Sequence, residues 1–155
     1  MVAPPASPGL TQALHRSLAC VSRIPTFVDV GNRRLRVGAA GERYALLHLE
    51  ARGLQILDRN FRTRVGELDL VAADEHTIVF CEVRTLVFPA TVERALESID
   101  RRKLQHLRAA AARWLAGRRG ECGLAGRKDL RFDAVAVIVD ADFRLRELRH
   151  LEGVL

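Results

Sequence analysis

The chain has 155 residues, which fits one domain that can bury a core without a metal or disulfide framework. Its 25 basic and 19 acidic side chains give a formal net charge of +6, which favours a polyanionic partner such as nucleic acid. Three cysteines without metal-ligand spacing exclude a disulfide scaffold, and no apolar run is long enough to span a membrane, so we expect a cytoplasmic protein.

The first part of the chain predicts an extension followed by a helix. Residues 1–32 lack sustained periodicity, apart from a short helix near 10–21, and we expect a loosely ordered N-terminal extension. The folded domain is expected to occupy residues 33–155. Apolar residues recur at helical spacing over about 37–52, and Gly53 provides a helix stop.

The rest of the domain alternates between strand-like and helix-like segments. Strands are expected over residues 54–61, 67–72, 77–84, 132–139 and 144–150, with one long helix over 91–115 and a glycine-bearing loop over 117–126. The order α-β-β-β-α-β-β predicts an α/β fold in which helices flank a mixed sheet.

Two acidic segments, residues 66–70 and 80–84, are the most informative feature of the sequence. A polar turn at 73–76 joins them and predicts an antiparallel hairpin, which places Asp69 and Glu82 opposite or diagonal to each other, roughly 5 to 8 Å apart. An uncompensated charge in such a buried strand costs several kcal/mol, so carboxylates placed there usually hold a cation. Oxygen ligands of this kind suit Mg²⁺ or Mn²⁺.

Strand alternation places Glu82 and Arg84 on the same face, so that a metal ligand and a charge stabiliser lie side by side. A metal ion held there can polarise a phosphoryl oxygen and activate a water, which fits hydrolysis of a nucleic-acid backbone. A simpler interpretation has Glu67 and Asp69 at exposed strand ends and Glu82 paired with an arginine. The hairpin alone leaves both interpretations open.

A series of short motifs runs through about residues 33–152. The motifs are Gly38, Gly41, Glu42, Ala45 and Leu49 in the first helix, Gly53 and Asn60 after it, 66–69 and 80–84 in the hairpin, and Lys103 and 131–133 later in the chain. Together they resemble the YraN family of bacterial proteins, whose fold is similar to that of restriction endonucleases and Holliday-junction resolvases, the PD-(D/E)XK class.

The resemblance implies a restriction-endonuclease-like fold with a divalent metal site for endonuclease chemistry. Asp69 and Glu82 fall at the metal-ligand positions of this class, and Glu42 falls where a carboxylate of the first helix approaches the same site. Glu42 also fits a solvated charge or one near the helix N-terminus. The implied partner is nucleic acid, with DNA favoured, and the analogy of fold makes the chain a candidate homodimer.

The sequence departs from the class at Arg84, where a lysine is expected. Arginine stays protonated and cannot act as a general base, although it can stabilise charge on a phosphate. Lys103 interrupts the apolar stripe of the long helix. Its methylenes can run along the core with the ammonium in water, or Lys103 can reach the acidic hairpin and replace the lysine missing at position 84.

Arginines near the hairpin in sequence are expected to contact phosphates without reading bases: Arg33, Arg34, Arg36, Arg62 and Arg64. Arginine supplies 23 of the 25 basic residues, an imbalance that the coding bias of a GC-rich genome can also produce. The leading hypothesis is a nucleic-acid-binding protein of nuclease-like fold that acts as a Mg²⁺-dependent endonuclease. The alternatives are an inactive nucleic-acid-binding or adaptor module of the same fold, and a structural protein with no nucleic-acid role.

Overall fold

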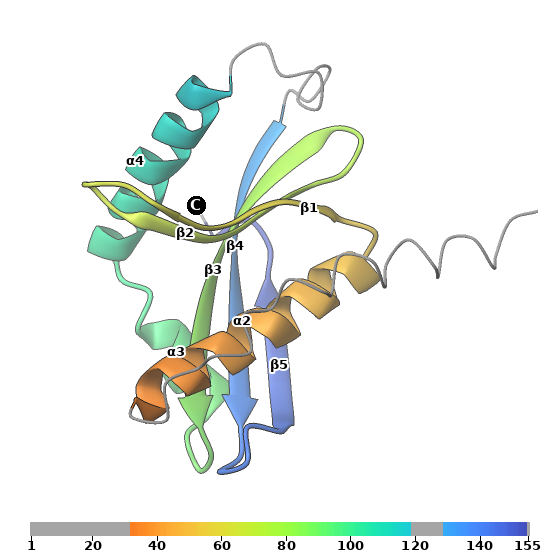
Figure 1. Ribbon diagram of the computed structural model, residues 1–155, viewed down its shortest axis with the longest axis vertical. Helices are drawn as coiled ribbons and strands as arrows, with labels where there is room; N and C mark the ends of the chain where they lie inside the picture. Colours follow the sequence, from red (N-terminus) through yellow and green to blue (C-terminus); the bar gives the residue numbers. More distant parts are fainter. Residues whose placement is uncertain (1–31, 119–128, 155) are drawn as a thin grey trace, which may run out of the picture. The chain divides into compact units, whose positions relative to one another are not determined.

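The computed structural model describes residues 32–118 and 129–154, which form a five-stranded mixed sheet with helices on both faces (Figure 1). The elements are α2 (Arg33–Ala51), β1 (Gln55–Arg62), β2 (Glu67–Ala73), β3 (Thr77–Val87), α3 (Val92–Glu97), α4 (Arg101–Gly117), β4 (Asp129–Val139) and β5 (Leu145–Leu151). The predicted α/β class, with helices flanking a mixed sheet and five strands in the expected places along the chain, is confirmed. None of the described helices is both long and apolar enough to cross a membrane.

Three sequence predictions fall wholly or largely outside the described residues: the extension over 1–32, the short helix near 10–21, and the loop over 117–126. The stop at the end of α2 is confirmed. The helix ends at Ala51, and Gly53 follows with a φ of 84°, a left-handed conformation that glycine adopts without steric cost.

The strands lie in the order β1-β2-β3-β4-β5, and every neighbouring pair is antiparallel except β3 and β4. The connection between these two parallel strands carries α3 and α4. Pairing of β2 with β3 stops at Leu70 and Cys81, although β2 stays paired with β1 back to Glu67 and β3 stays paired with β4 up to Val87. The sheet therefore splits between β2 and β3.

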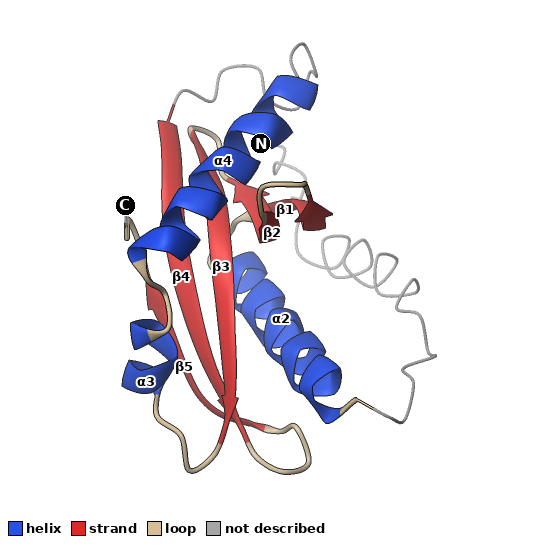
Figure 2. Ribbon diagram, turned by 90° about the vertical axis from the view of Figure 1, so that its left-hand side faces the viewer, coloured by secondary structure: helices blue, strands red, loops and turns tan. Residues whose placement is uncertain are grey.

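Side chains of β3 alternate between two hydrophobic layers, as predicted. Val79 and Cys81 pack in the layer that contains Leu49 of α2, whereas Phe80 packs with Trp114 of α4. Figure 2 shows α2 on one side of the sheet and α3 and α4 on the other. Glu82 and Arg84 therefore belong to the α3 and α4 face, because they alternate in step with Phe80.

The single long helix predicted over 91–115 is wrong, because two helices occupy this range. The first helix ends at Glu97, and the second begins at Arg101 after Asp100, whose backbone is extended and whose side chain accepts a hydrogen bond from the Lys103 amide at 2.8 Å. Asp100 thus caps a new helix. The break places Lys103 in the first turn of α4.

Two glycines let the helices approach the split in the sheet. A Cβ at residue 41 of α2 would lie 1.7 Å from Thr85 Oγ1 of β3, and a Cβ at residue 66 would lie 2.8 Å from the carbonyl oxygen of His106 of α4. Any larger residue would push these elements apart. The glycines therefore hold α2 and α4 against the strands that flank the split.

Candidate functional site

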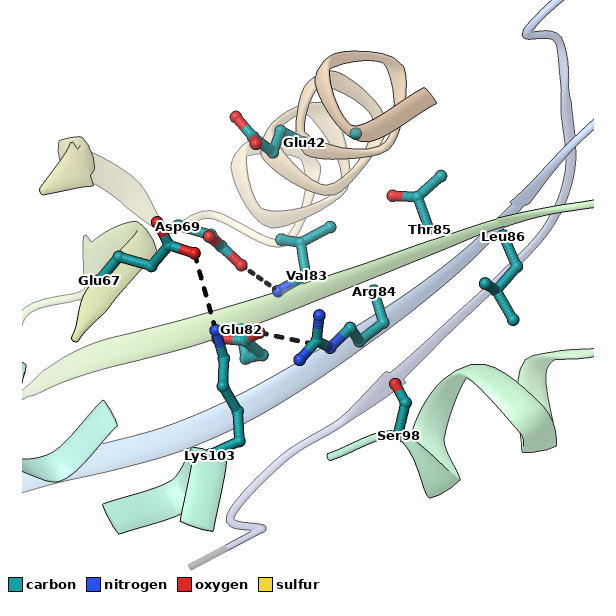
Figure 3. A pocket seen from close by; sticks show the side chains of 11 residues that line it. Glu42, Glu67, Asp69, Glu82, Val83, Arg84, Thr85, Leu86, Ser98 and Lys103 are labelled. Atoms are coloured by element: carbon teal, nitrogen blue, oxygen red, sulfur yellow. Dashed lines mark hydrogen bonds and ion pairs between the residues drawn. The ribbon is translucent and has the colours of Figure 1, made fainter. Parts of the chain in front are cut away.

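The split between β2 and β3 is filled by the side chain of Asp69. The amide of Val83 donates a hydrogen bond of 2.8 Å to Asp69 Oδ2, so that a carboxylate takes the place of a strand partner (Figure 3). Continuing the register by one residue beyond Leu70 and Cys81 sets Asp69 against Glu82. The negative charge of Glu82 also acts on the Asp69 carboxyl, so the two carboxylates lie near each other at the split.

These carboxylates line an open cavity of about 400 Å³ (Figure 3). Its walls come from α2 (Gly38, Glu42), β2 (Glu67, Asp69), β3 (Glu82, Val83, Arg84, Thr85, Leu86), α4 (Lys103) and the segment between α3 and α4 (Ser98). Two helices, two strands and one connecting segment are thus needed to form the cavity. Its polar lining is dominated by four carboxylates and two cations.

Glu82 is the most buried charged residue of the cavity, with 1% of its surface exposed. Lys103 Nζ lies 3.0 Å from Glu82 Oε1, and Arg84 Nε lies 3.5 Å from the same oxygen. The other oxygen, Oε2, is buried and has no hydrogen-bond partner. A buried carboxylate oxygen without a partner is costly, so the cavity has an acceptor suited to a bound cation or water.

Burial raises the pKa values of both acids. The pKa of Asp69 is raised to about 7, first by burial and then by the negative charge of Glu82, while the hydrogen bond from Val83 opposes the rise. Burial also raises the pKa of Glu82, against the opposing effect of Lys103. Two carboxyl groups with raised pKa values that influence each other are characteristic of functional sites.

Lys103 reaches the acidic hairpin, which is one of the two possibilities that the sequence left open. Its side chain is 22% exposed, and its Nζ lies 3.8 Å from Glu67 Oε1 in addition to the closer contact with Glu82. The alternative, in which its ammonium extends into water, is wrong. A catalytic role for Lys103 stays a prediction.

Glu42 also lies at the cavity. It belongs to the third turn of a helix that begins at Arg33, so the interpretation as a charge at the helix N-terminus is wrong. Asn60 Nδ2 donates a hydrogen bond of 2.8 Å to Glu42 Oε2. The negative charge of Glu42 contributes to the raised pKa of Asp69, so the carboxylates of Glu42 and Asp69 interact.

Glu67 lines the cavity but was not predicted as a site residue. About half of its side chain is exposed, and Arg62 Nε and Lys103 Nζ each lie 3.8 Å from one of its oxygens. The sequence signal that could have identified Glu67 is its spacing of two residues from Asp69, because residues two apart lie on the same face of a regular strand.

The five arginines predicted to contact phosphates separate in space. Arg62 lines a second cavity of about 300 Å³, which shares Glu67 and Lys103 with the first. Arg33, Arg34 and Arg64 are exposed but line neither cavity. The Arg36 guanidinium stacks 4.6 Å from the ring centre of Phe143, between β4 and β5. Only Arg62 of this set is brought to the site.

A further buried acid, Asp133, lies on the neighbouring strand but not in the cavity. It accepts hydrogen bonds from Arg131, His150 and the Gly153 amide. Burial would raise the pKa of Asp133, but these hydrogen bonds outweigh it and lower the pKa. Asp133 is thus a fully bonded structural residue, in contrast to Glu82.

The family model described as "Uncharacterised protein family UPF0102" matches residues 41–137 of this chain. The chain is 44% identical to a UPF0102 protein of Beutenbergia cavernae over 118 residues, which cover 76% of this chain and 94% of the relative. It is 43% identical to one of Moorella thermoacetica over 120 residues, covering 77% and 95%, and 40% identical to one of Corynebacterium efficiens over 120 residues, covering 77% and 91%. The matched range includes the carboxylates and cations that line the cavity.

Proposed function

The chain belongs to the UPF0102 family, which is the YraN family that its motifs resemble, and we propose that it binds nucleic acid and hydrolyses phosphodiester bonds with the help of Mg²⁺ or Mn²⁺. One observation carries this proposal. Asp69 and Glu82 converge from neighbouring strands on one open cavity, and an oxygen of Glu82 is buried there without a partner. DNA is the favoured substrate class.

The donor set fits a hard divalent ion. Among the described residues, no cluster of three or more His, Cys, Asp or Glu side chains is arranged to hold a metal. Asp69 and Glu82 supply two carboxylates to one cavity, and Mg²⁺ commonly uses one or two carboxylates and keeps several waters. Asp69 and Glu82 would hold the ion, which when bound polarises a phosphoryl oxygen and lowers the pKa of a water.

The cations of the cavity suit a phosphate. Arg84 Nε has no hydrogen-bond partner and lies in the same cavity as Lys103. Two positive charges beside the carboxylates can neutralise the charge that grows on the phosphoryl oxygens during hydrolysis. In this proposal Lys103, which contacts Glu82 from α4, takes the place of the lysine that the PD-(D/E)XK class carries at the position of Arg84.

The second cavity extends the path of a bound strand. It adjoins the first at Glu67 and Lys103 and adds Arg62 and His106 to the lining. A phosphate next to the scissile one can contact Arg62 there without any base being read, which predicts binding that depends on salt but little on sequence.

The test is cleavage of labelled branched, flapped and single-stranded DNA with Mg²⁺ or Mn²⁺. We expect the wild-type chain to cut at least one of these substrates, and we expect chelation of the metal, Asp69→Asn or Glu82→Gln to reduce cutting to background. Glu75→Gln, in the exposed turn between β2 and β3, is the matched control and should cut like wild type. Cutting that persists in both site variants would contradict the proposal.

A second candidate, an inactive nucleic-acid-binding module, is favoured by one contact. The ammonium of Lys103 lies 3.0 Å from Glu82 and already neutralises that carboxylate without a metal. This candidate predicts binding to DNA that weakens steeply with salt, does not respond to Mg²⁺, and is not accompanied by cutting.

A further inference from the structure

Strand β5 lies at the edge of the sheet and has one free side. It pairs with β4, and no other strand in the described parts of the chain pairs with it (Figure 1). Leu145 and Leu151, at its two ends, are 42% and 39% exposed. An exposed edge strand with apolar side chains is a template for pairing with another strand.

The sequence of β5 is complementary to itself when it is read in the opposite direction. We propose that two copies of this chain pair through β5, antiparallel, with the two-fold axis at Leu148. In this register the central cross-strand pairs are matched: Leu148 faces Leu148, and Glu147 of each copy faces Arg149 of the other. A two-fold axis repeats every contact, so both pairs of Glu147 with Arg149 form.

The neighbouring registers are less favourable. An axis at Glu147 sets two glutamates opposite each other, and an axis at Arg149 sets two arginines opposite each other. An axis halfway between two residues is excluded, because it would set side chains on one face of the sheet against side chains on the other face. Like charges directly opposite are destabilising, whereas opposite charges and apolar pairs stabilise a sheet. The sequence therefore favours the axis at Leu148.

The central charged side chains are partly exposed, and within one copy Arg149 lies 3.6 Å from Glu147, so pairing across the axis would exchange or share this ion pair. The side chains of Glu147 and Arg149 are 52% and 45% exposed, and Arg149 is held toward α3 by a hydrogen bond of 2.7 Å to Glu93. The pairing of β5 with β4 has a bulge between Leu145 and Glu147, where Arg146 has no partner in β4. This bulge lies outside residues 147–149, which form the central pairs of the dimer. The segment that carries the charge pairs is regular.

Pairing through β5 would join two sheets into one of ten strands. No residue of β5 lines either cavity, so both candidate sites would stay open in the dimer. The inference rests on β5 alone, and it stands or fails independently of the proposed nuclease activity.

The test uses charge reversal in the full chain, with mass measured by sedimentation over a concentration series under reducing conditions. We expect a dimer for wild type. Glu147→Arg and Arg149→Glu each replace two attractive pairs by two repulsive ones, and each should raise the dimer dissociation constant about tenfold or more. Glu75→Arg, in the exposed turn between β2 and β3, carries the same charge change as Glu147→Arg and should dimerise like wild type.

Mixing the two reversed variants gives the decisive result. One copy then carries arginine at both positions and the other carries glutamate at both, so every central charge pair is attractive again and a heterodimer should form. The double variant Glu147→Arg/Arg149→Glu should likewise recover the homodimer. A monomeric wild-type chain, a dimer that survives both single reversals, or a mixture that stays monomeric overturns the proposal.

Discussion

Replacing Lys103 by methionine tests the electrostatics of the cavity most directly. The ammonium lies 3.0 Å from Glu82 Oε1, and the side chain of Glu82 is only 2% exposed. Breaking a buried ion pair by removing one partner costs about 3–5 kcal/mol. Because Lys103 is 22% exposed and Arg84 stays 3.5 Å from the same oxygen, we expect a smaller loss, about 2 kcal/mol of the free energy of unfolding at pH 8 without metal.

The sign of the pH dependence follows from the carboxylate that is left behind. Without Lys103, the raised pKa of Glu82 should rise further, so the folded state holds a proton that the unfolded state has released. The deficit relative to wild type should therefore shrink as the pH falls toward the pKa of Glu82 and grow as the pH rises. Urea unfolding at several pH values measures this deficit.

A double-mutant cycle decides whether Glu82 is responsible. In a Glu82→Gln background no buried charge is left to lose its partner, so Lys103→Met should cost less than about 0.5 kcal/mol. If Lys103→Met costs nothing in the wild-type background, or costs as much in the Glu82→Gln background as in the wild-type one, then the ion pair does not hold the carboxylate as inferred.

Three other outcomes are expected. The pKa of Asp69 is raised to about 7, so Mn²⁺ should bind more tightly as the pH rises to about 8, and its binding below pH 7 should release a proton. Calorimetry in buffers of different ionisation enthalpy measures this release. Binding at pH 6 without proton release contradicts the prediction. Burial, followed by the nearby charges of His150 and Arg52, lowers the pKa of His48, so the unfolded state binds more protons and stability should fall as the pH drops below about 6.5; urea unfolding of His48→Gln should show a weaker fall. Gly41→Ala should cost about 1–3 kcal/mol in thermal or urea unfolding because its Cβ would meet Thr85, and Thr85→Ala should restore part of that loss. The matched change Gly38→Ala, in the same helix with nothing within 4 Å of its Cβ, should stabilise by about 0.5–1 kcal/mol, and equal losses at both positions would refute the packing argument.

The sequence predicts the hairpin and its faces because strand alternation is a local property. The period of two in β3 is enough to place Glu82 and Arg84 on one side of the sheet and Cys81 on the other, and the structure agrees. The split between β2 and β3 has no local signal. It depends on how β1 and α4 hold the start of β2, including the contact of Gly66 with the backbone of α4.

The break between α3 and α4 was missed because the apolar stripe continues through it. Val92 packs against Ile138 and Leu107 packs with Phe80, so each half of the stripe is buried, but by different strands. A capping aspartate, Asp100, was the available signal. Proximity in sequence was also a poor guide for the arginines at the start of α2, Arg33, Arg34 and Arg36. The helix is 19 residues long, so residues at its start lie far along its axis from residues near its end.

Because of the split in the sheet, the backbone amide proton of Val83 is sensitive to the state of the cavity. In a continuous ladder the amide of Val83 would be held by a carbonyl, and its exchange with solvent would follow the opening of the strands. Here it is held by the Asp69 carboxylate, so its chemical shift and exchange rate follow the protonation of that group. A single resonance in a nitrogen–proton NMR spectrum thus reports on occupancy of the candidate site before any substrate is known.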